Sequence, residues 1–504
     1  MEWIYKNNRE NKFIFIMGCI IGLLCALPFI SNLIYSIDDY HLWNVYDINW
    51  ETMGYNFYST GRIVEGILAE ILFRFNLQPL NRPMGMVVFI ASLAMFGTLV
   101  GKLLNIRNIM LKFLICILIV LNPFNTEIFY YSNITVYSGI AVFFLTVGFW
   151  YSHQYVDKKR RVYLLYSCFF YCLSLGVYQI FYPMVFFIIL LAVIRDFNEN
   201  EMQWRKYAIY SGIYFLSFLL FYIFLKFMFA FIPPSLIYEG IDLGEFIKKL
   251  FSPNYYIRLL GIVKQYYGDT ILHSSLAFGS VVIGSGIICI LGLLNVHRDK
   301  RIVYFVGVCL FLLLGPVMCI GFGLARPDDI SARTFTSYGV YLGGLLLIDY
   351  YYLRDICKKK ESIKEQCIKI VTIVFAVICF INGSLIGKAA NNIIRLNNKE
   401  ANMVNRIVGR MEEFEEFTGY EPLVIQGVPM LSGISDKSLG NLGQPASASF
   451  SKVLLFNEVS GYSFSIPNAE QVKQASKIID DMSTWPQKDS VAYIDGIFVV
   501  RLYW

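Results

Sequence analysis

The sequence predicts an all-α polytopic membrane bundle with a small external α/β domain at its C-terminal end. Hydrophobic residues make up 56% of the 504 residues, charged residues make up 16%, and the mean hydropathy is +0.53. A chain of this composition buries most of its length in lipid. The apolar runs stop near residue 388, and the balanced charge of 389–504 is typical of a small soluble domain.

About eleven apolar runs can be interpreted as membrane-spanning helices, which need roughly 17–25 residues. They lie at 13–33, 84–104, 109–123, 134–152, 162–178, 180–194, 207–232, 275–294, 302–322, 337–353 and 368–388. The fifth and sixth runs are short and almost continuous through Tyr178 and Gln179. The first run is too long for a removable signal peptide and has no small-residue cleavage site beside it, so we expect a retained helix.

Lysine and arginine alternate between the predicted loops. The intervening loops 123–133 and 178–183 hold neither residue. The basic loops lie around residues 6–12, 107–112, 158–161, 195–206, 298–301 and 354–364. Because basic loops stay in the cytoplasm, the N-terminus is predicted inside and the C-terminal domain outside. The formal net charge of +6 follows from these loops, so it indicates contact with anionic lipids and not with nucleic acid.

Two external segments are predicted to lie on the membrane surface. The loop 34–83 contains the run 61–75, whose apolar residues share one helical face and which is too short to span a bilayer. We expect an in-plane amphipathic helix there. The loop 233–274 mixes apolar and aromatic residues with Lys and Arg, which is also typical of a segment that meets lipid head groups.

The region 389–504 predicts a small α/β domain. An amphipathic helix with apolar residues from Met403 to Phe417 should open it, and Asp495-Gly496 is a two-residue turn signal for a closing hairpin. No glycine-rich phosphate motif is present, so the domain is expected to recognise the acceptor or to cover the site. The expected elements are strands at 422–428 and 451–457, a helix at 468–482, and hairpin strands at 491–494 and 497–502.

Asp38 and Asp39 follow the first predicted span and are the candidate catalytic residues. Adjacent carboxylates at the mouth of a membrane helix suit chemistry on a substrate held at the surface, with one of them as general base. The competing interpretation is a solvated or helix-capping role. Side chains one residue apart diverge, so only one should face the reacting atoms, and Asp39 is slightly favoured.

No metal site and no cofactor are predicted. Asp38, Asp39 and His41 could offer ligands to a divalent metal, but the sequence identifies no further ligand for it. The 11 cysteines fall in predicted spans or cytoplasmic loops, where a small buried thiol is the ordinary interpretation.

Several short motifs outside the spans stand in a fixed order. They are Ser36-Ile37-Asp38-Asp39-Tyr40, Gly61-Arg62 before the surface helix, Gly176-Val177-Tyr178-Gln179, and Arg326-Pro327-Asp328-Asp329 followed by Arg333. This order resembles that of the bacterial serotype-converting glucosyltransferase family, which are membrane glycosyltransferases of GT-C type. The resemblance covers most of the membrane region. It implies transfer of a hexose, typically glucose, from a polyprenyl-phosphate donor to a surface polysaccharide or other envelope glycan at the outer face of the bacterial cytoplasmic membrane, with a flippase as a possible partner.

A departing lipid phosphate needs cations where its negative charge grows. Arg62 could instead pair with Glu65, and Lys226 could snorkel to the interface. Arg326 and Arg333 could pair with the aspartates of their own motif. The four candidate phosphate contacts are Arg62, Lys226, Arg326 and Arg333.

Three further residues are candidate substrate contacts. Glu127 could orient a sugar hydroxyl, although it is as readily a simple loop residue. Tyr137 could stack on a sugar ring, although aromatic residues are expected at any membrane interface. Gln179 belongs to the third motif of the resemblance.

Two other classes of protein share this topology. A flippase or transporter of a lipid-linked sugar should carry ionisable residues near the bilayer midplane, on interrupted helices related by an internal repeat. Here they concentrate at the outer surface and no repeat is evident, which favours an enzyme. An envelope polysaccharide polymerase is the remaining alternative.

Overall fold

The computed structural model describes residues 9–32, 34–44, 57–58, 60–75, 77, 81–198, 203–231, 248, 251–264, 319, 331–356, 361–429 and 445–503. Within these ranges, seven helices are long and apolar enough to cross a membrane, which indicates a membrane protein. The expected runs 275–294 and 302–322 lie outside the described residues, apart from Cys319. The run 162–178 forms a helix of only 17 residues, so the number of eleven spans stays a prediction.

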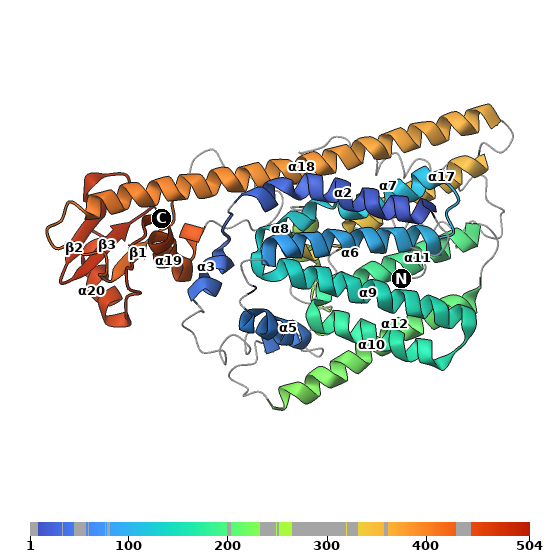
Figure 1. Cartoon of the computed structure of the whole chain (residues 1–504), viewed down its shortest axis with the longest axis horizontal. Helices are drawn as coiled ribbons and strands as arrows, with labels where there is room; N and C mark the ends of the chain where they lie inside the picture. Colours follow the sequence, from blue (N-terminus) through green and yellow to red (C-terminus); the bar gives the residue numbers. More distant parts are fainter. Residues whose placement is uncertain are drawn as a thin grey trace.

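The axes of the long helices of the bundle are roughly aligned with one another (Figure 1). They are α2 (Arg9–Ser31), α6 (Asn81–Leu103), α7 (Ile109–Val120), α9 (Ser132–Lys158), α10 (Arg161–Val177), α11 (Pro183–Asn198), α12 (Trp204–Phe229), α17 (Tyr338–Ile356) and α18 (Glu361–Met411). Two of them, α6 and α9, approach closely through glycine. A Cβ atom on Gly139 would lie 2.7 Å from the backbone nitrogen of Phe89, so only glycine fits this contact. Small residues are the usual means of close helix packing in membranes.

Short elements replace long helices at the bundle end that faces the C-terminal part of the chain (Figure 1). The side-chain amide of Asn122 donates to the backbone oxygens of Phe335, at 3.0 Å, and Thr336, at 3.2 Å. It thereby ties the segment after α7 to the segment before α17. The short elements are α3 (Ile37–Asn44), α5 (Ile63–Arg74), η2 (Pro123–Asn125), α8 (Thr126–Tyr130), η3 (Gln179–Phe181) and η9 (Ala332–Thr334).

The last expected span and the helix expected to open the C-terminal domain form one continuous helix, α18, of 51 residues. The expected boundary at residue 388 therefore falls inside a helix. Beyond the bundle, Met403, Val404 and Ile407 of α18 pack into a separate apolar core. We call the elements around this core, including the distal part of α18, the C-terminal domain.

The C-terminal domain contains a three-stranded sheet in the order β1-β3-β2. The strands are β1 (Leu423–Gln426), β2 (Val491–Ile494) and β3 (Ile497–Arg501). β1 pairs with β3 in parallel, with Leu423 opposite Phe498, and β2 and β3 are antiparallel. The predicted hairpin is confirmed: Asp495 and Gly496 have φ values of 48° and 82°, as a primed two-residue turn requires.

The strand expected at 451–457 is wrong, because this segment lies in the helix α19 (Ser449–Ser460). A short apolar run such as Val453-Leu454-Leu455-Phe456 fits a buried strand or a buried helix equally well, and periodicity cannot separate them. Gly461, with φ of 76°, ends the helix in the left-handed conformation usual for a C-terminal cap. The helix expected at 468–482 is confirmed as α20 (Ala469–Ile479), which starts at a capping box of Asn468 and Gln471.

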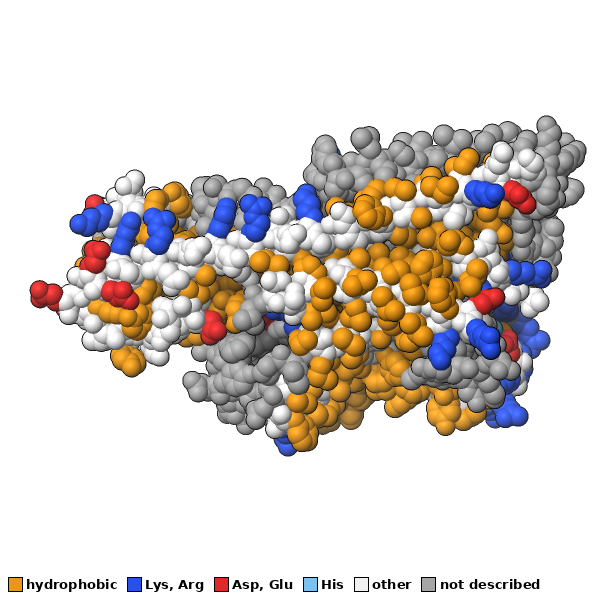
Figure 2. Space-filling view, turned by 45° about the horizontal axis from the view of Figure 1, so that its top comes forward, with side chains coloured by type: hydrophobic (Ala, Val, Ile, Leu, Met, Phe, Trp, Pro, Cys, Tyr) orange, Lys and Arg blue, Asp and Glu red, His pale blue; other side chains and the backbone are white. Residues whose placement is uncertain are grey.

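Both predicted surface segments contain a helix. The run 61–75 forms α5, and the described part of 233–274 forms α14 (Pro253–Val263), where Ile257 and Leu260 are exposed. Hydrophobic side chains cover much of the bundle face visible in Figure 2, while Lys and Arg gather at the end remote from the C-terminal domain and along α18. An apolar belt with a basic end is what a membrane-spanning bundle should present.

Candidate active site

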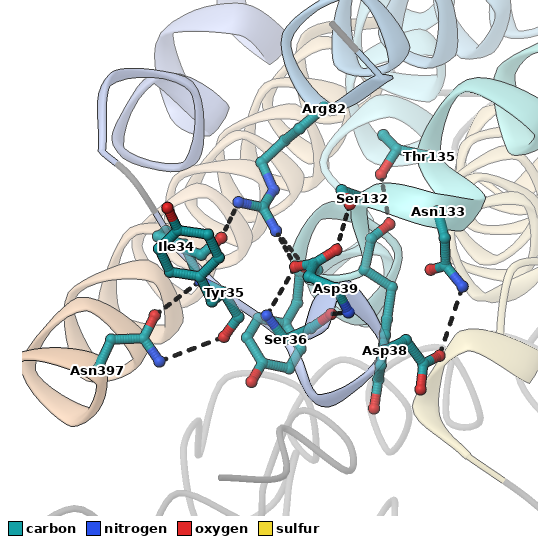
Figure 3. A network of polar contacts seen from close by, with 12 residues as sticks. Ile34, Tyr35, Ser36, Asp38, Asp39, Arg82, Ser132, Asn133, Thr135 and Asn397 are labelled. Atoms are coloured by element: carbon teal, nitrogen blue, oxygen red, sulfur yellow. Dashed lines mark hydrogen bonds and ion pairs between the residues drawn. The ribbon is translucent and has the colours of Figure 1, made fainter. Parts of the chain in front are cut away.

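The two candidate aspartates lie in the first turn of α3 (Figure 3). This helix lies at the bundle end next to the C-terminal domain (Figure 1). The backbone nitrogen of Asp39 donates to the hydroxyl of Ser36 at 3.2 Å, and the Asp39 carboxylate accepts from the backbone nitrogen of Ser36 at 2.7 Å. This reciprocal pair is a capping box with aspartate in the place of the usual glutamate. The helix start is therefore encoded locally, and Asp39 is part of it.

Asp39 also fastens α3 to the bundle. Its Oδ2 atom lies 2.7 Å from Nη2 of Arg82 on α6, and its Oδ1 atom accepts from the hydroxyl of Ser132 on α9. Arg82 donates further to the backbone oxygens of Ile34 and Tyr130. Asp39 is only 2% exposed, so both of its carboxylate oxygens are occupied inside the protein.

Arg82 was not among the residues singled out from the sequence, although a signal was present. It stands at the start of an apolar run on the predicted external side, where the preference for cytoplasmic basic residues disfavours it. An arginine in such a place needs a buried acidic partner, and Asp39 is that partner.

Asp38 is in a more open position than Asp39. It is partly exposed, and the amide nitrogen of Asn133 lies 3.5 Å from its Oδ2 atom, which is long for a hydrogen bond. The pKa of the Arg333 guanidinium is raised against the effect of burial by the nearby groups Tyr178, Glu127, Tyr131 and Asp38.

Glu127 of α8 holds Arg333 in place. It is buried, and its Oε2 atom accepts from the backbone nitrogen of Arg333 at 2.9 Å, while Oε1 lies 3.7 Å from the guanidinium Nε atom. The guanidinium stacks over the ring of Tyr131 at 5.4 Å. Glu127 thus positions Arg333 and is not exposed to contact a sugar.

Arg62 approaches the same place from α5. Its guanidinium lies 5.5 Å from the ring centre of Phe57 and 5.6 Å from that of Tyr178, and its Nη1 atom is 3.1 Å from Oε2 of Glu65. The pKa of Tyr178 is raised by burial and lowered by Arg333 and Arg62. Tyr178 therefore interacts electrostatically with both arginines, which come from different parts of the chain.

Glu65 of α5 is fully buried. Ile67 and Ile71 are exposed, whereas Ile63 and Ala69 are buried, so α5 turns two large apolar side chains outward and its acid inward. Burial raises the pKa of Glu65 to about 7, against the lowering effect of Arg62. An outward apolar face suits a helix in contact with lipid, and its in-plane orientation stays a prediction.

Gln179 and Tyr137 support the loop before α5. The amide nitrogen of Gln179 donates to the backbone oxygen of Gly61 at 3.2 Å. Gly61 has φ of 77°, a conformation that favours glycine. Tyr137 is buried and packs edge-on against Phe57 at 6.3 Å. Gln179 and Tyr137 therefore contact neighbours of Arg62 in the chain or around its guanidinium.

The other two candidate cations are not joined to this group by the described contacts. Lys226 is exposed on α12, where its ammonium lies 5.6 Å from the ring of Tyr222. Arg326, with Asp328 and Asp329, lies outside the described residues. Among the residues that the structure describes, no three His, Cys, Asp or Glu side chains gather as a metal site would require.

The described part of the chain is an apolar bundle of membrane type that collects acidic and basic side chains at one end. The sequence profile of the family described as Glucosyl transferase GtrII matches residues 27–343. This match covers well over half of the chain, and it includes α3, α5, α8 and η9. The protein belongs to this family and is a glycosyltransferase. Comparison with curated proteins finds no match.

Proposed function

We propose that the protein transfers a hexose, glucose in the first instance, from a polyprenyl-phosphate donor to an envelope glycan at the outer face of a bacterial cytoplasmic membrane. Family membership implies a glucosyltransferase. The observation that carries the rest is the grouping of Asp38, Arg62 and Arg333 at one end of an apolar bundle. A polyprenyl-linked sugar cannot leave the bilayer, so its anomeric carbon has to be attacked at such an end.

Asp38 is the proposed general base, in preference to Asp39. Asp39 already accepts hydrogen bonds from Ser36, Arg82 and Ser132, and it is only 2% exposed, so it is less accessible to a substrate than Asp38. The partly exposed carboxylate of Asp38 would take the proton of the acceptor hydroxyl as its oxygen attacks the anomeric carbon. The bond from that carbon to the phosphate oxygen breaks, and the phosphate departs with the electron pair. General base catalysis of this kind contributes about 10²–10⁴-fold.

Arg62 and Arg333 are the proposed contacts of the departing phosphate. Two guanidinium groups that converge from α5 and η9 can share the growing negative charge, and each can bind phosphate through two N–H groups. The aromatic rings of Phe57, Tyr131 and Tyr178 hold them in place before the substrate arrives. Pre-positioned donors of this type stabilise a transition state without reorganisation.

The proposed donor and acceptor would reach the site from different sides. A flippase would deliver the lipid-linked sugar to the outer leaflet. Membership in a glucosyl transferase family favours transfer over flipping, and no step of the proposal is assigned to a metal or a cofactor. The acceptor glycan would approach from the side of the C-terminal domain.

Transfer by purified Asp38→Asn and Asp39→Asn variants tests the proposal in detergent, with polyprenyl-phosphate glucose labelled in the sugar. Asp38→Asn should bind the donor normally and lose about 10²–10⁴-fold in turnover. Asp39→Asn should lower the yield of folded protein, because it weakens the contact with Arg82. Asp481→Asn, on the exposed surface of the C-terminal domain, is the matched control and should behave as wild type.

Three results would overturn the assignment. Wild-type turnover by Asp38→Asn would remove Asp38 as the base. An intact donor in detergent, combined with lipid movement in sealed vesicles, would identify a flippase. Chain growth from a lipid-linked repeat unit, without use of the monosaccharide donor, would identify a polymerase.

A further inference from the structure

The helix that carries Asp38 is in contact with two separate bodies. Tyr40, two residues after Asp38, is 4% exposed and belongs to the apolar core of the C-terminal domain, together with Val404 and Phe456. On the other side, Asp39 is bound to Arg82 and Ser132 of the bundle. Consecutive residues of one turn therefore point into different parts of the molecule.

Asn397 of α18 holds the segment before α3 through both of its amide atoms (Figure 3). Its Oδ1 atom accepts from the backbone nitrogen of Tyr35 at 2.9 Å, and its Nδ2 atom donates to the backbone oxygen of the same residue at 3.2 Å. The Tyr35 hydroxyl donates to Glu458 of α19 at 3.3 Å. Tyr35 also packs against Tyr40, with ring centres 5.4 Å apart.

The residues that make this contact are themselves fixed to the C-terminal domain. Glu400, one turn after Asn397, is buried and accepts from the backbone nitrogen of Ala446 at 2.9 Å. The Asn397 amide also lies 3.5 Å from Glu400. The contacts run without a break from the domain through Asn397 to Tyr35 and then into the capping box of α3.

A two-turn helix has little stability of its own, because nucleating a helix costs more than so few hydrogen bonds return. The eight residues of α3 therefore depend on the bodies that hold them. Removing one body leaves the helix attached at one side only. The carboxylate of Asp38 would then lose its fixed position even though Asp38 itself is unchanged.

We propose that the C-terminal domain is a working part of the active site, and that Asn397 and Tyr40 are positioning residues that set the place of Asp38. This inference rests on the proposed role of Asp38 as general base. It assigns the domain a part in the chemical step, besides any part in acceptor recognition. A displacement of the base by about 1 Å can cost around 10²-fold in rate.

The test compares Asn397→Ala with Asn398→Ala in the full-length protein. Asn398 is the adjacent residue of the same type on the exposed face of α18, so it controls for the loss of an amide from the helix. Asn397→Ala should lower kcat about tenfold or more with unchanged KM for the donor, and Asn398→Ala should change neither. Asn397→Gln, which keeps the amide at a different reach, should recover only part of the rate.

Tyr40 provides a second route to the same result. Tyr40→Phe keeps the ring in the domain core and should retain activity, whereas Tyr40→Ala should lower kcat. Limited proteolysis of the C-terminal domain in each variant shows whether the domain remains folded. If Tyr40→Ala does not fold, the Asn397 series decides alone.

A double mutant separates positioning from a general loss of structure. If Asn397 acts through Asp38, adding Asn397→Ala to Asp38→Asn should cause little further loss, because the base is already absent. Equal losses in both backgrounds, or a wild-type kcat for Asn397→Ala beside an inactive Asp38→Asn, would overturn the inference and leave the proposed function intact. Wild-type turnover by Asp38→Asn itself would instead overturn the proposed function.

Discussion

The two ends of the bundle both bury ion pairs, but they use them differently. At the basic end, Arg195 and Asp196 are neighbours in sequence, and Nε of Arg195 donates to Oδ1 of Asp196 at 2.7 Å. The hydroxyl of Tyr207 donates to the other carboxylate oxygen of Asp196. Arg195 also reaches the backbone oxygen of Leu103. This set is closed on itself and binds α11 to α12 and α6.

At the other end, Arg62 pairs with Glu65 and Arg333 with Glu127, and both guanidinium groups also lie against aromatic rings. Arg62 and Arg333 stack over Phe57, Tyr178 and Tyr131, and Asp38 is partly exposed. A closed ion pair stabilises a fold, whereas charges held by rings and backbone stay available to a ligand. Within this end, Asp39 with Arg82 repeats the closed type, while the adjacent Asp38 is partly exposed.

The largest expected difference is that the two ends lie on opposite sides of the membrane, with the C-terminal domain outside and the basic end in the cytoplasm. Ser476→Cys on α20 should react fully with a membrane-impermeant thiol reagent in intact spheroplasts, and Arg160→Cys before α10 should react only after lysis, because basic loops stay in the cytoplasm. Both residues are exposed. Wild-type protein, whose 11 cysteines all precede the C-terminal domain, gives the background. The reverse pattern would invert the topology and remove the proposed mechanism with it.

Removal of an arginine should affect the two ends in opposite ways. Arg62→Ala and Arg333→Ala should each lower transfer about 10- to 100-fold, since a charge-assisted contact is worth about 1.5–3 kcal/mol. Lysine should restore only part of the rate, because it lacks the planar fork. Arg195→Ala should instead reduce the amount of folded protein, with turnover per folded molecule kept. Full activity of both Ala variants at normal protein levels would exclude these residues from the site.

The buried acid of α5 should produce a smaller, pH-dependent effect. Burial raises the pKa of Glu65 to about 7, above the ordinary value of about 4.3 for glutamate. The protonated form is therefore favoured by the fold, and its stabilising contribution is complete below pH ~4 and declines as the pH rises through about 7. Glu65→Gln is neutral at every pH, so the thermal midpoint of wild type should fall relative to this variant over that interval. Parallel pH profiles would show that the fold does not raise the pKa of Glu65.

The smallest effect is expected at Lys226. Its side chain is exposed on α12 and reaches the ring of Tyr222 on its own helix, so Lys226→Ala should leave transfer within about twofold of wild type, as for most exposed surface changes. Comparison of Lys226→Ala with Arg62→Ala shows whether any cation near the surface can assist the transfer. A loss as large as that of Arg62→Ala would bring Lys226 into the site.

Local patterns in the sequence were sufficient for elements that local chemistry determines. The apolar runs predicted the long helices, and Asp495-Gly496 predicted the hairpin, because helix and turn formation depend on residues close in the chain. The strand prediction at 451–457 was wrong because the local pattern is ambiguous there: a short apolar run shows no periodicity that separates a strand from a helix. The sequence did not predict that α18 is one continuous helix, because the apolar residues of its first part suit lipid contact whereas those of its last part pack into the domain core.

The candidate site divides in the same way. Asp38, Asp39, Arg62, Arg333 and Glu127 were singled out from the sequence. The pairing of Arg62 with Glu65 was also anticipated there, but the partners that lie far away in the chain were not. Partners such as Asp39 with Arg82, or Asn397 with Tyr35, are separated by tens to hundreds of residues, and one sequence carries no signal of that pairing. The distinction between a closed aspartate and an open one follows from those distant partners.

The continuous helix α18 sets the angular relation between the membrane and the C-terminal domain. Each residue of an α-helix advances the chain by about 1.5 Å and turns it by about 100°. A single residue inserted near Lys388 would therefore rotate Asn397 and the whole domain by roughly a quarter turn away from Tyr35. An insertion of eleven residues would restore the rotation but lift the domain by about 16 Å. The rotation of α18 therefore fixes the orientation of the domain relative to the bundle, in addition to the contacts between them. An insertion or deletion in this stretch should break the contact between Asn397 and Tyr35 and release α3.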